Sequence, residues 1–291
     1  MLEISHEEPQ HNNITDGSVE SFGGESKFVD IQPSLESQIS NIPVIVAGGW
    51  SETPKSLQDV GEEITSKGRR TILVEHARSG GKDKDQTDYP PETQQRANTL
   101  LVTLDKLNID KADIIAHSEG ALDAVFAAMQ SPERFRSLIL VAPAGMIGED
   151  SIPALSARFS KKIVRGWTKD ARENPKAAYR LNTGTPQYVA KNPVKAIREI
   201  KDISSITIEE ALTDIKESGV NVSIIQSQSD QVFPSERINK NVVLGENVDR
   251  HASVVSEDAG HDDLIVHPER STRAALQMID QFEEDRQVSS E

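Results

Sequence analysis

Four short apolar segments without polar alternation constrain the fold of this chain more than any other feature of its sequence. They lie at residues 43–47 (PVIVA), 71–74 (TILV), 114–116 (IIA) and 137–141 (SLILV). Strands that are apolar on both faces are typical of a buried parallel sheet. Segments with helical periodicity separate them, and Thr53-Pro54 opens the first of these helices. The sequence therefore predicts βαβ units with right-handed crossovers.

The alternation of strands and helices stops after residue 145. Residues 146–215 hold helical segments punctuated by four prolines and no clear strand, and the strand pattern returns at residues 220–225 and near 252–255. An all-helical segment between two strands of one sheet is typical of a cap. We therefore predict an α/β core of residues 41–145 and 216–291, with a mostly parallel sheet flanked by helices, and an inserted helical cap at residues 146–215.

The first 40 residues are polar, with turn signals at Asp16-Gly17 and Gly23-Gly24 and weak strand patterns at residues 18–22 and 27–31. Two interpretations are open. The segment is either a tail followed by a hairpin at the edge of the sheet, or a stretch without fixed structure. It has neither the basic start nor the apolar stretch of a secretory signal, so we expect a cytoplasmic protein.

Composition excludes several classes of function. The net charge of -15 argues against nucleic-acid binding, which needs clustered lysine and arginine. The chain contains no cysteine, which excludes disulfides, thiolate catalysis and cysteine-bound metals. No segment approaches the roughly 18 consecutive apolar residues that span a bilayer, so we expect no membrane span.

Ser118 lies where the apolar run 114–116 meets a segment with helical periodicity. A serine at the tip of a sharp strand-to-helix turn is the arrangement of a nucleophile elbow. The turn is tight, so the residues two positions before and after the serine must be small. Ala116 and Gly120 occupy these positions. The pattern makes Ser118 a candidate nucleophile.

Four further segments stand in a recognisable order around this serine: 47–50 (AGGW), 75–81 (EHARSGG), 224–234 (IIQSQSDQVFP) and 259–262 (AGHD). With the elbow, they resemble motifs of the α/β-hydrolase superfamily, and the resemblance covers residues 41–286 apart from the cap. It implies the α/β-hydrolase fold and a catalytic triad in the chain order Ser118, Asp230, His261.

The resemblance also implies a role for each site residue. Asp230 accepts a hydrogen bond from His261 and fixes its tautomer, and His261 takes the proton of Ser118 and later delivers it to the leaving group. The backbone N–H groups of Trp50 and Glu119 form an oxyanion hole. The side chain of Glu119 should point outward or be paired, because a free carboxylate would repel an oxyanion.

The remaining residues of these motifs are expected to be structural. His117 is expected to pack or hydrogen-bond away from the reaction, and segment 75–81 is assigned no chemistry. His267 is the rival base, although it lacks the Gly-His context of His261. Three histidines are expected to be solvated at the surface: His6, His11 and His251.

The resemblance implies hydrolysis of a carboxylic ester in a small to medium acyl substrate through an acyl-serine, with no metal or organic cofactor. The same triad is compatible with amide or aminopeptide hydrolysis, C–C bond hydrolysis, acyl transfer and perhydrolysis. An alternative from another class is a ligand-binding protein on this fold that no longer turns over, but such a protein has no need of all three triad residues. The sequence leaves the oligomeric state open.

Residues 146–200 carry eleven basic and five acidic residues in a chain that is acidic as a whole. One hypothesis is that this segment favours an anionic substrate or faces an anionic surface. The alternative is that these charges lie on solvated helix faces. Phe159 and Trp167 are expected in the core of the cap.

Overall fold

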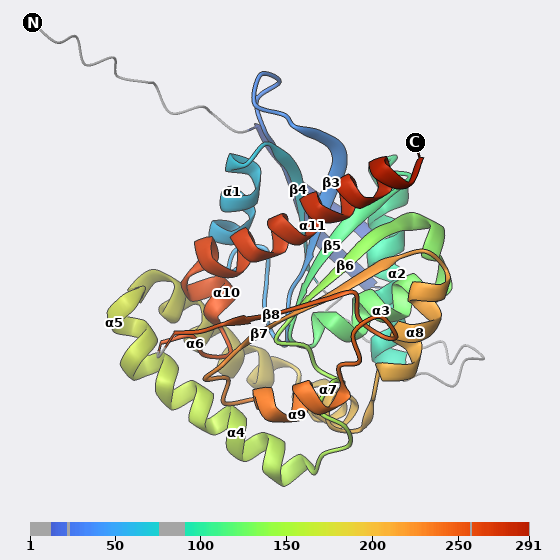
Figure 1. Ribbon diagram of the computed structural model, residues 1–291. Helices are drawn as coiled ribbons and strands as arrows, with labels where there is room; N and C mark the ends of the chain where they lie inside the picture. The colour runs from blue at the N-terminus through green and yellow to red at the C-terminus, as the bar shows by residue number, and fades with distance from the viewer. Residues whose placement is uncertain (1–12, 22–23, 76–90, 257, 291) are drawn as a thin grey trace, which may run out of the picture.

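The computed structural model describes residues 13–21, 24–75, 91–256 and 258–290. An eight-stranded sheet in the order β1-β2-β4-β3-β5-β6-β7-β8 runs through the molecule (Figure 1). Its strands are β1 (Asn13–Ser21), β2 (Gly24–Gln32), β3 (Ser40–Ala47), β4 (Arg69–Val74), β5 (Ala112–His117), β6 (Phe135–Val141), β7 (Asn221–Ser227) and β8 (Arg250–Val254).

Strands β3 to β8 pair in parallel, as their apolar patterns predict, whereas β2 pairs antiparallel with both β1 and β4. Strands β1 and β2 form a hairpin at the edge of the sheet. The turn predicted at Asp16-Gly17 is wrong, because both residues lie inside β1. Gly17 faces Phe28, and a Cβ atom there would lie 2.2 Å from the tip of the phenyl ring. The glycine makes room for the ring of the neighbouring strand.

Alternate residues of each central strand enter two hydrophobic cores on opposite faces of the sheet. Val44 and Val46 belong to one core, and Ile45 and Ala47 belong to the other. Helices α1 and α11 cover the first face, and α2, α3 and α8 cover the second. The helices outside the insertion are α1 (Gln58–Ser66), α2 (Pro91–Lys106), α3 (Gly120–Gln130), α8 (Glu209–Glu217), α9 (Ser235–Asn241), α10 (Asp263–Val266) and α11 (Pro268–Ser290).

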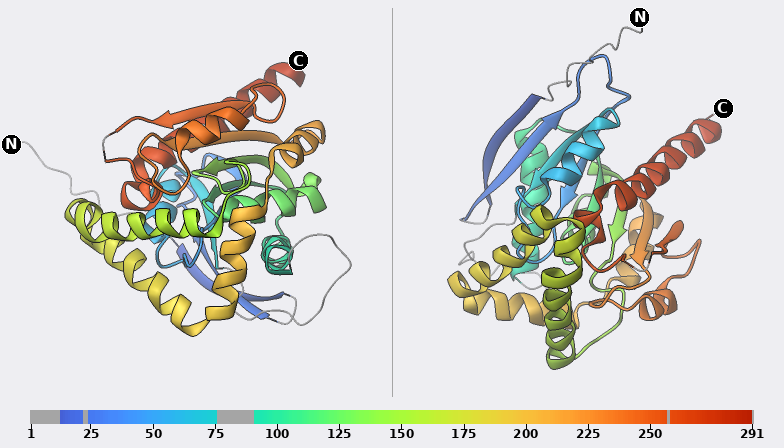
Figure 2. Two further views of the ribbon diagram at one scale, coloured as in Figure 1. Left: turned by 90° about the horizontal axis from the view of Figure 1, so that it is seen from below. Right: turned by 90° about the vertical axis from the view of Figure 1, so that its left-hand side faces the viewer.

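Helices α4 to α7 lie between β6 and β7 in the chain and pass across one end of the sheet (Figures 1 and 2). They are α4 (Ile152–Arg165), α5 (Ala171–Glu173), α6 (Pro175–Lys191) and α7 (Pro193–Ser205). We call residues 152–205 the helical insertion. Pro153, Pro175 and Pro193 lie in first turns of helices, where a missing N–H costs nothing, but Pro186 lies inside α6 and does not end it.

Helix α8 begins inside the predicted cap segment 146–215 and ends two residues beyond it, yet it packs on α3 and β7. Leu212 and Ile215 of α8, and Ile208 just before it, are buried in the core of the sheet. Two other predicted boundaries shift by a few residues. Helix α1 begins at Gln58, since Thr53 first forms hydrogen-bonded turns, and β8 begins at Arg250. Along the described ranges, no helix combines the length and apolarity needed to cross a bilayer.

Candidate active site

Ser118 sits at the junction of β5 and α3 with a left-handed backbone, φ 54°. Its N–H donates to the carbonyl of Val141 at 3.0 Å, and its carbonyl accepts from the N–H of Ala144 at 3.0 Å. A Cβ atom on Gly120 would lie 2.5 Å from the carbonyl oxygen of Ala47, so only glycine lets α3 pack this closely on β3. The backbone strain at a non-glycine residue is typical of functional turns.

The three residues predicted to act together are brought into one hydrogen-bonded row. His261 Nε2 lies 2.9 Å from Ser118 Oγ, and His261 Nδ1 lies 2.9 Å from Asp230 Oδ2. All three residues are buried. Because a carboxylate only accepts, Nδ1 carries the proton and Nε2 is left to accept from the serine hydroxyl.

Asp230 is held from its other side by the loop that follows β7. Its Oδ1 accepts from the backbone N–H groups of Val232 at 2.7 Å and Phe233 at 2.9 Å. The ring of Phe233 packs edge-on against His261, with 5.2 Å between centroids. The loop therefore fixes the carboxylate of Asp230 and also packs against the imidazole ring of His261, which that carboxylate orients.

The Gly48-Gly49-Trp50 loop after β3 packs directly against the serine. A Cβ atom on Gly49 would lie 2.8 Å from the Cβ of Ser118. Within the described part of the chain, no protein acceptor takes a hydrogen bond from the backbone N–H of Trp50 or of Glu119. The role of these two amides as an oxyanion hole stays a prediction.

A second histidine–carboxylate pair lies beside the triad and involves His117, which was predicted to pack or hydrogen-bond away from the reaction. Its Nδ1 lies 2.8 Å from Glu52 Oε1 and its Nε2 lies 2.9 Å from the backbone oxygen of His261. Glu52 Oε2 also accepts from the Gly49 N–H at 2.6 Å. Although burial alone would lower it, Glu52 raises the pKa of His117 to about 9. Both ring nitrogens face acceptors, which fits the imidazolium form.

The carboxylate of Glu119 is paired, as expected for the residue after the serine. Its Oε1 lies 2.5 Å from Nη1 of Arg96, which comes from α2. Burial raises the pKa of Glu119, and the carboxylates of Glu199 and Asp123 add to this effect against the charge of Arg96. The pairing turns the carboxylate toward Arg96.

The rival histidine lies outside the triad. His267 Nε2 faces Glu173 Oε2 at 3.1 Å, so it does not bond to Ser118. His251 is half-buried within β8 and not fully solvated, because this edge strand is partly covered. His6, His11 and residues 76–81 of the predicted loop lie outside the described residues.

Two aromatic side chains predicted for the cap core have different surroundings. Phe159 is buried and joins two site rings, with centroids 5.4 Å from Trp50 and 6.4 Å from His261. The prediction for Trp167 is wrong, since its side chain is 51% exposed. In the helical turn 166–170 the buried positions are Gly166 and Asp170, so Trp167 lies on the outer side of that turn.

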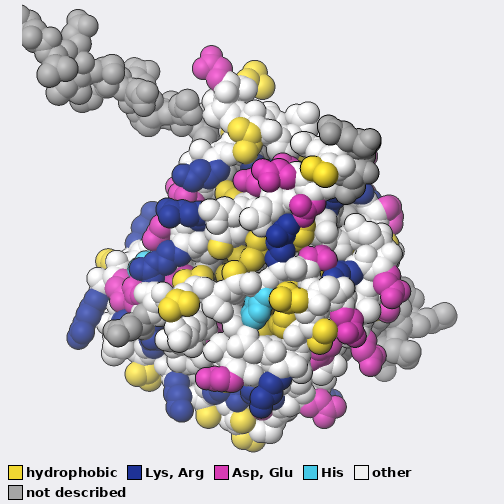
Figure 3. Space-filling model, viewed as in Figure 1, with side chains coloured by type: hydrophobic (Ala, Val, Ile, Leu, Met, Phe, Trp, Pro, Cys, Tyr) yellow, Lys and Arg dark blue, Asp and Glu magenta, His cyan; other side chains and the backbone are white. Residues whose placement is uncertain are grey.

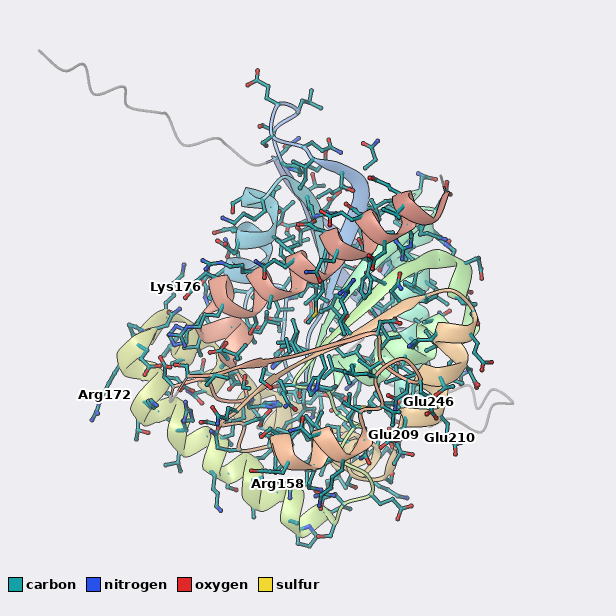
Figure 4. All side chains as sticks on the ribbon, in the orientation of Figure 1. Arg158, Arg172, Lys176, Glu209, Glu210 and Glu246 are labelled. Carbon is teal, nitrogen blue, oxygen red and sulfur yellow. The ribbon has the colours of Figure 1, made fainter. Side chains whose placement is uncertain are left out.

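Most basic residues of the helical insertion are paired with carboxylates. On the face shown in Figure 3, dark-blue and magenta side chains are interspersed, whereas Arg172 extends away from the body of the protein (Figure 4). The paired residues are Arg158, Lys162, Arg165, Lys176, Arg180, Lys195 and Arg198. One pair reaches the triad segment: Lys162 lies 2.9 Å from Asp262, beside His261. These pairs reduce the free positive charge that could act at long range.

A cavity of about 360 Å³ lies between α6, α7 and the loop that follows Trp50. Polar and charged side chains line much of it, including Lys55, Arg96, Tyr188, Lys191 and Glu199. Ser118, Asp230 and His261 are not among its lining residues. Trp50 lies between the two regions, because its indole bonds to Glu199 of the lining while its ring packs on Phe159, whose ring lies 6.4 Å from that of His261.

Two groups of described residues bring three potential metal-ligand atoms within 4.8 Å of one another. They are His117, His261 and Asp262, and Glu173, Asp258 and His267. In the first group, the nitrogens of His117 and His261 are engaged by the hydrogen bonds already described. In the second, Arg270 donates to Asp258 at 3.0 Å and already supplies a positive charge.

Comparison with known proteins gives distant similarities along most of the chain. The sequence matches no protein-family model. It is 24% identical over 253 residues to a "Putative non-heme haloperoxidase" of Mycobacterium phage D29, covering 82% of this chain and 88% of that protein.

Two solved structures superpose on nearly the whole chain. A thermophilic esterase from Thermogutta terrifontis is 17% identical, with a TM-score of 0.68, over 92% of this chain and 99% of that one. A serine hydrolase involved in carbazole degradation is 20% identical, with a TM-score of 0.67, over 92% of this chain and 100% of that one. Strand order, helices on both faces and these superpositions together show that the protein has the α/β-hydrolase fold.

Proposed function

We propose that this protein is a serine hydrolase that cleaves a carboxylic ester, or a related acyl bond, of a small to medium substrate through an acyl-serine intermediate. The observation that carries the proposal is the hydrogen-bonded row from Asp230 through His261 to Ser118, with 2.9 Å at both steps. The similar esterase and serine hydrolase structures support the same class of reaction.

The proposed reaction starts when His261 Nε2 takes the hydroxyl proton and Ser118 Oγ attacks the substrate carbonyl carbon. The carbonyl electron pair moves to oxygen, where the N–H groups of Trp50 and Glu119 stabilise the negative charge. The tetrahedral intermediate then collapses, the C–O bond to the leaving alcohol breaks, and His261 gives the alcohol its proton.

The second half of the reaction frees the enzyme. Water attacks the acyl-serine, its proton passes to His261, and the second tetrahedral intermediate releases the carboxylic acid while Ser118 regains its proton. Asp230 keeps the proton of His261 on Nδ1 throughout and stabilises the imidazolium.

A second candidate reaction uses the same acyl-serine with hydrogen peroxide in place of water, which gives a peracid and returns the proton to Ser118. The similarity to the phage protein named as a haloperoxidase favours including it. Peracid formation from an acetate ester, with and without hydrogen peroxide, separates perhydrolysis from hydrolysis.

Labelling with a fluorophosphonate probe tests the proposed function. We expect the wild-type protein to label and Ser118→Ala to remain unlabelled. A wild-type protein that does not react would contradict the proposal. If labelling succeeds, turnover of paired ester and amide substrates identifies the bond that is cleaved.

A further inference from the structure

Glu199 of helix α7 is a fully buried carboxylate that receives hydrogen bonds from three different parts of the protein. Trp50 Nε1 donates to its Oε2 at 2.7 Å. The hydroxyl of Tyr188, from α6, lies 2.6 and 2.7 Å from the two oxygens. The guanidinium of Arg96, from α2, donates to Oε1. One side chain of the insertion thus bonds both to the core helix α2 and to the loop after β3.

Arg96 extends this network to the residue after the serine. While one of its terminal nitrogens bonds to Glu199, the other lies 2.5 Å from Glu119 Oε1. Glu199 therefore bonds to Trp50 directly and to Glu119 through a single guanidinium. These are the two residues whose backbone N–H groups are proposed to form the oxyanion hole.

We propose that Glu199 is a positioning residue that sets the relative placement of the two oxyanion N–H donors. This inference rests on the proposed function. Donors in an oxyanion hole act only when they meet the developing charge at hydrogen-bond distance. The carboxylate of Glu199 holds the indole of Trp50 directly and the side chain of Glu119 through Arg96. The position of the insertion on the core therefore influences the geometry of both donors.

Docking of the insertion on α2 can be tested separately from this geometry, because α2 and α7 share another ion pair. Arg198 lies 3.1 Å from Glu92, with its side chain 64% exposed. That pair connects the same two helices but contacts neither Trp50 nor Glu119 in any bond found among the described residues. Glu92→Gln is therefore a matched control for Glu199→Gln.

The test compares kcat and KM of a neutral ester for wild type, Glu199→Gln and Glu92→Gln, together with inhibition by an alkyl boronic acid, which forms a tetrahedral adduct with serine. For Glu199→Gln we expect kcat to fall by about 10- to 100-fold and boronate affinity to fall with it, while KM stays within about threefold. Glu92→Gln should retain wild-type values.

A folded Glu199→Gln protein with wild-type kcat, or with a change in KM alone, would overturn the inference. If that variant does not fold, Trp50→Phe decides, since it keeps an aromatic ring and removes the N–H that bonds to Glu199. Reduced kcat and boronate affinity in Trp50→Phe would support the inference, and unchanged values would refute it. Wild-type protein that fails to label with fluorophosphonate would instead refute the proposed function.

Discussion

The Nε2 atom of His117 lies 2.9 Å from the backbone oxygen of His261, 144 residues away in the chain. Glu52 bonds to the other nitrogen of the His117 ring and to the Gly49 N–H. This buried pair thereby connects the glycine loop, the segment before the serine and the histidine loop. Its ionisation should matter for both stability and activity.

The His117–Glu52 pair predicts a loss of stability at alkaline pH. The pKa of His117 is about 9 in the folded protein, against about 6.5 in the unfolded chain, so its contribution is complete below pH 6.5 and disappears as the pH rises through 9. The shift corresponds to about 3 kcal/mol. Urea denaturation of wild type and His117→Asn at pH 6.5 and 9.5 measures it.

In His117→Asn, the free energy of unfolding should differ much less between pH 6.5 and pH 9.5 than it does in the wild type. Burial also raises the pKa of Glu119 and of Asp123, which lowers stability as pH rises above their unfolded values, so the comparison with the variant isolates the histidine. The other charged groups near the pair are Asp262 and Lys162. Equal pH dependence in the two proteins would show that His117 is not the titrating group.

Replacing the two rival histidines should have very different effects. His261→Ala removes the proposed base and should lower kcat by about 10³-fold or more, because both proton transfers are lost. His267→Ala loses contacts with Glu173, Asp258 and Glu269, none of which belongs to the triad, and kcat should stay within a few-fold of wild type. Steady-state kinetics with circular dichroism as the fold control checks both variants. A large kcat loss confined to His267→Ala would reassign the base.

Gly120→Ala should destabilise the protein by about 1–3 kcal/mol, since the new methyl group would lie 2.5 Å from the carbonyl of Ala47 and 2.6 Å from that of Gly48. Gly184→Ala is the control, because a Cβ there meets nothing within 4 Å and the site lies inside α6. It should stabilise by about 0.5–1 kcal/mol. Free energies of unfolding that change equally in both variants would exclude the packing explanation.

Replacing two lysines that line the cavity tests whether their positive charge favours an anionic substrate. Lys55→Gln with Lys191→Gln should raise KM about 3- to 10-fold for an ester with a carboxylate on its acyl chain, and the effect should shrink in added salt. KM for a neutral isosteric ester should not change. Arg172→Gln, which removes an exposed charge outside the cavity lining, is the control. Equal changes for both esters would exclude charge recognition.

Local sequence patterns were sufficient to predict those parts of the fold that depend on neighbouring residues in the chain. Apolar runs located the central strands, and small residues around Ser118 indicated the tight turn. Gly17 shows where such reasoning fails, because its glycine accommodates Phe28 across the hairpin and does not form a turn. Pro186 likewise sits inside α6, although proline usually ends a helix.

The charged network could not be found from the sequence. Arg96 and Glu199 are 103 residues apart, and no spacing or motif relates them to each other or to Glu119. Their contact depends on how the helical insertion lies against α2, a tertiary arrangement that periodicity does not encode. The sequence did predict that the side chain of Glu119 must point outward or be paired. It did not indicate which residue would be its partner.

The attachment of the insertion at Glu199 has a consequence for the evolution and engineering of specificity. Residues 152–205 enter and leave between neighbouring strands, which makes them appear exchangeable as a module. A transplanted module that lacks a carboxylate facing Trp50 would leave the positive charge of Arg96 buried with one fewer partner. Chimaeric proteins should therefore retain Tyr188 and Glu199 in any transplanted insertion and vary only the exposed helix faces around them.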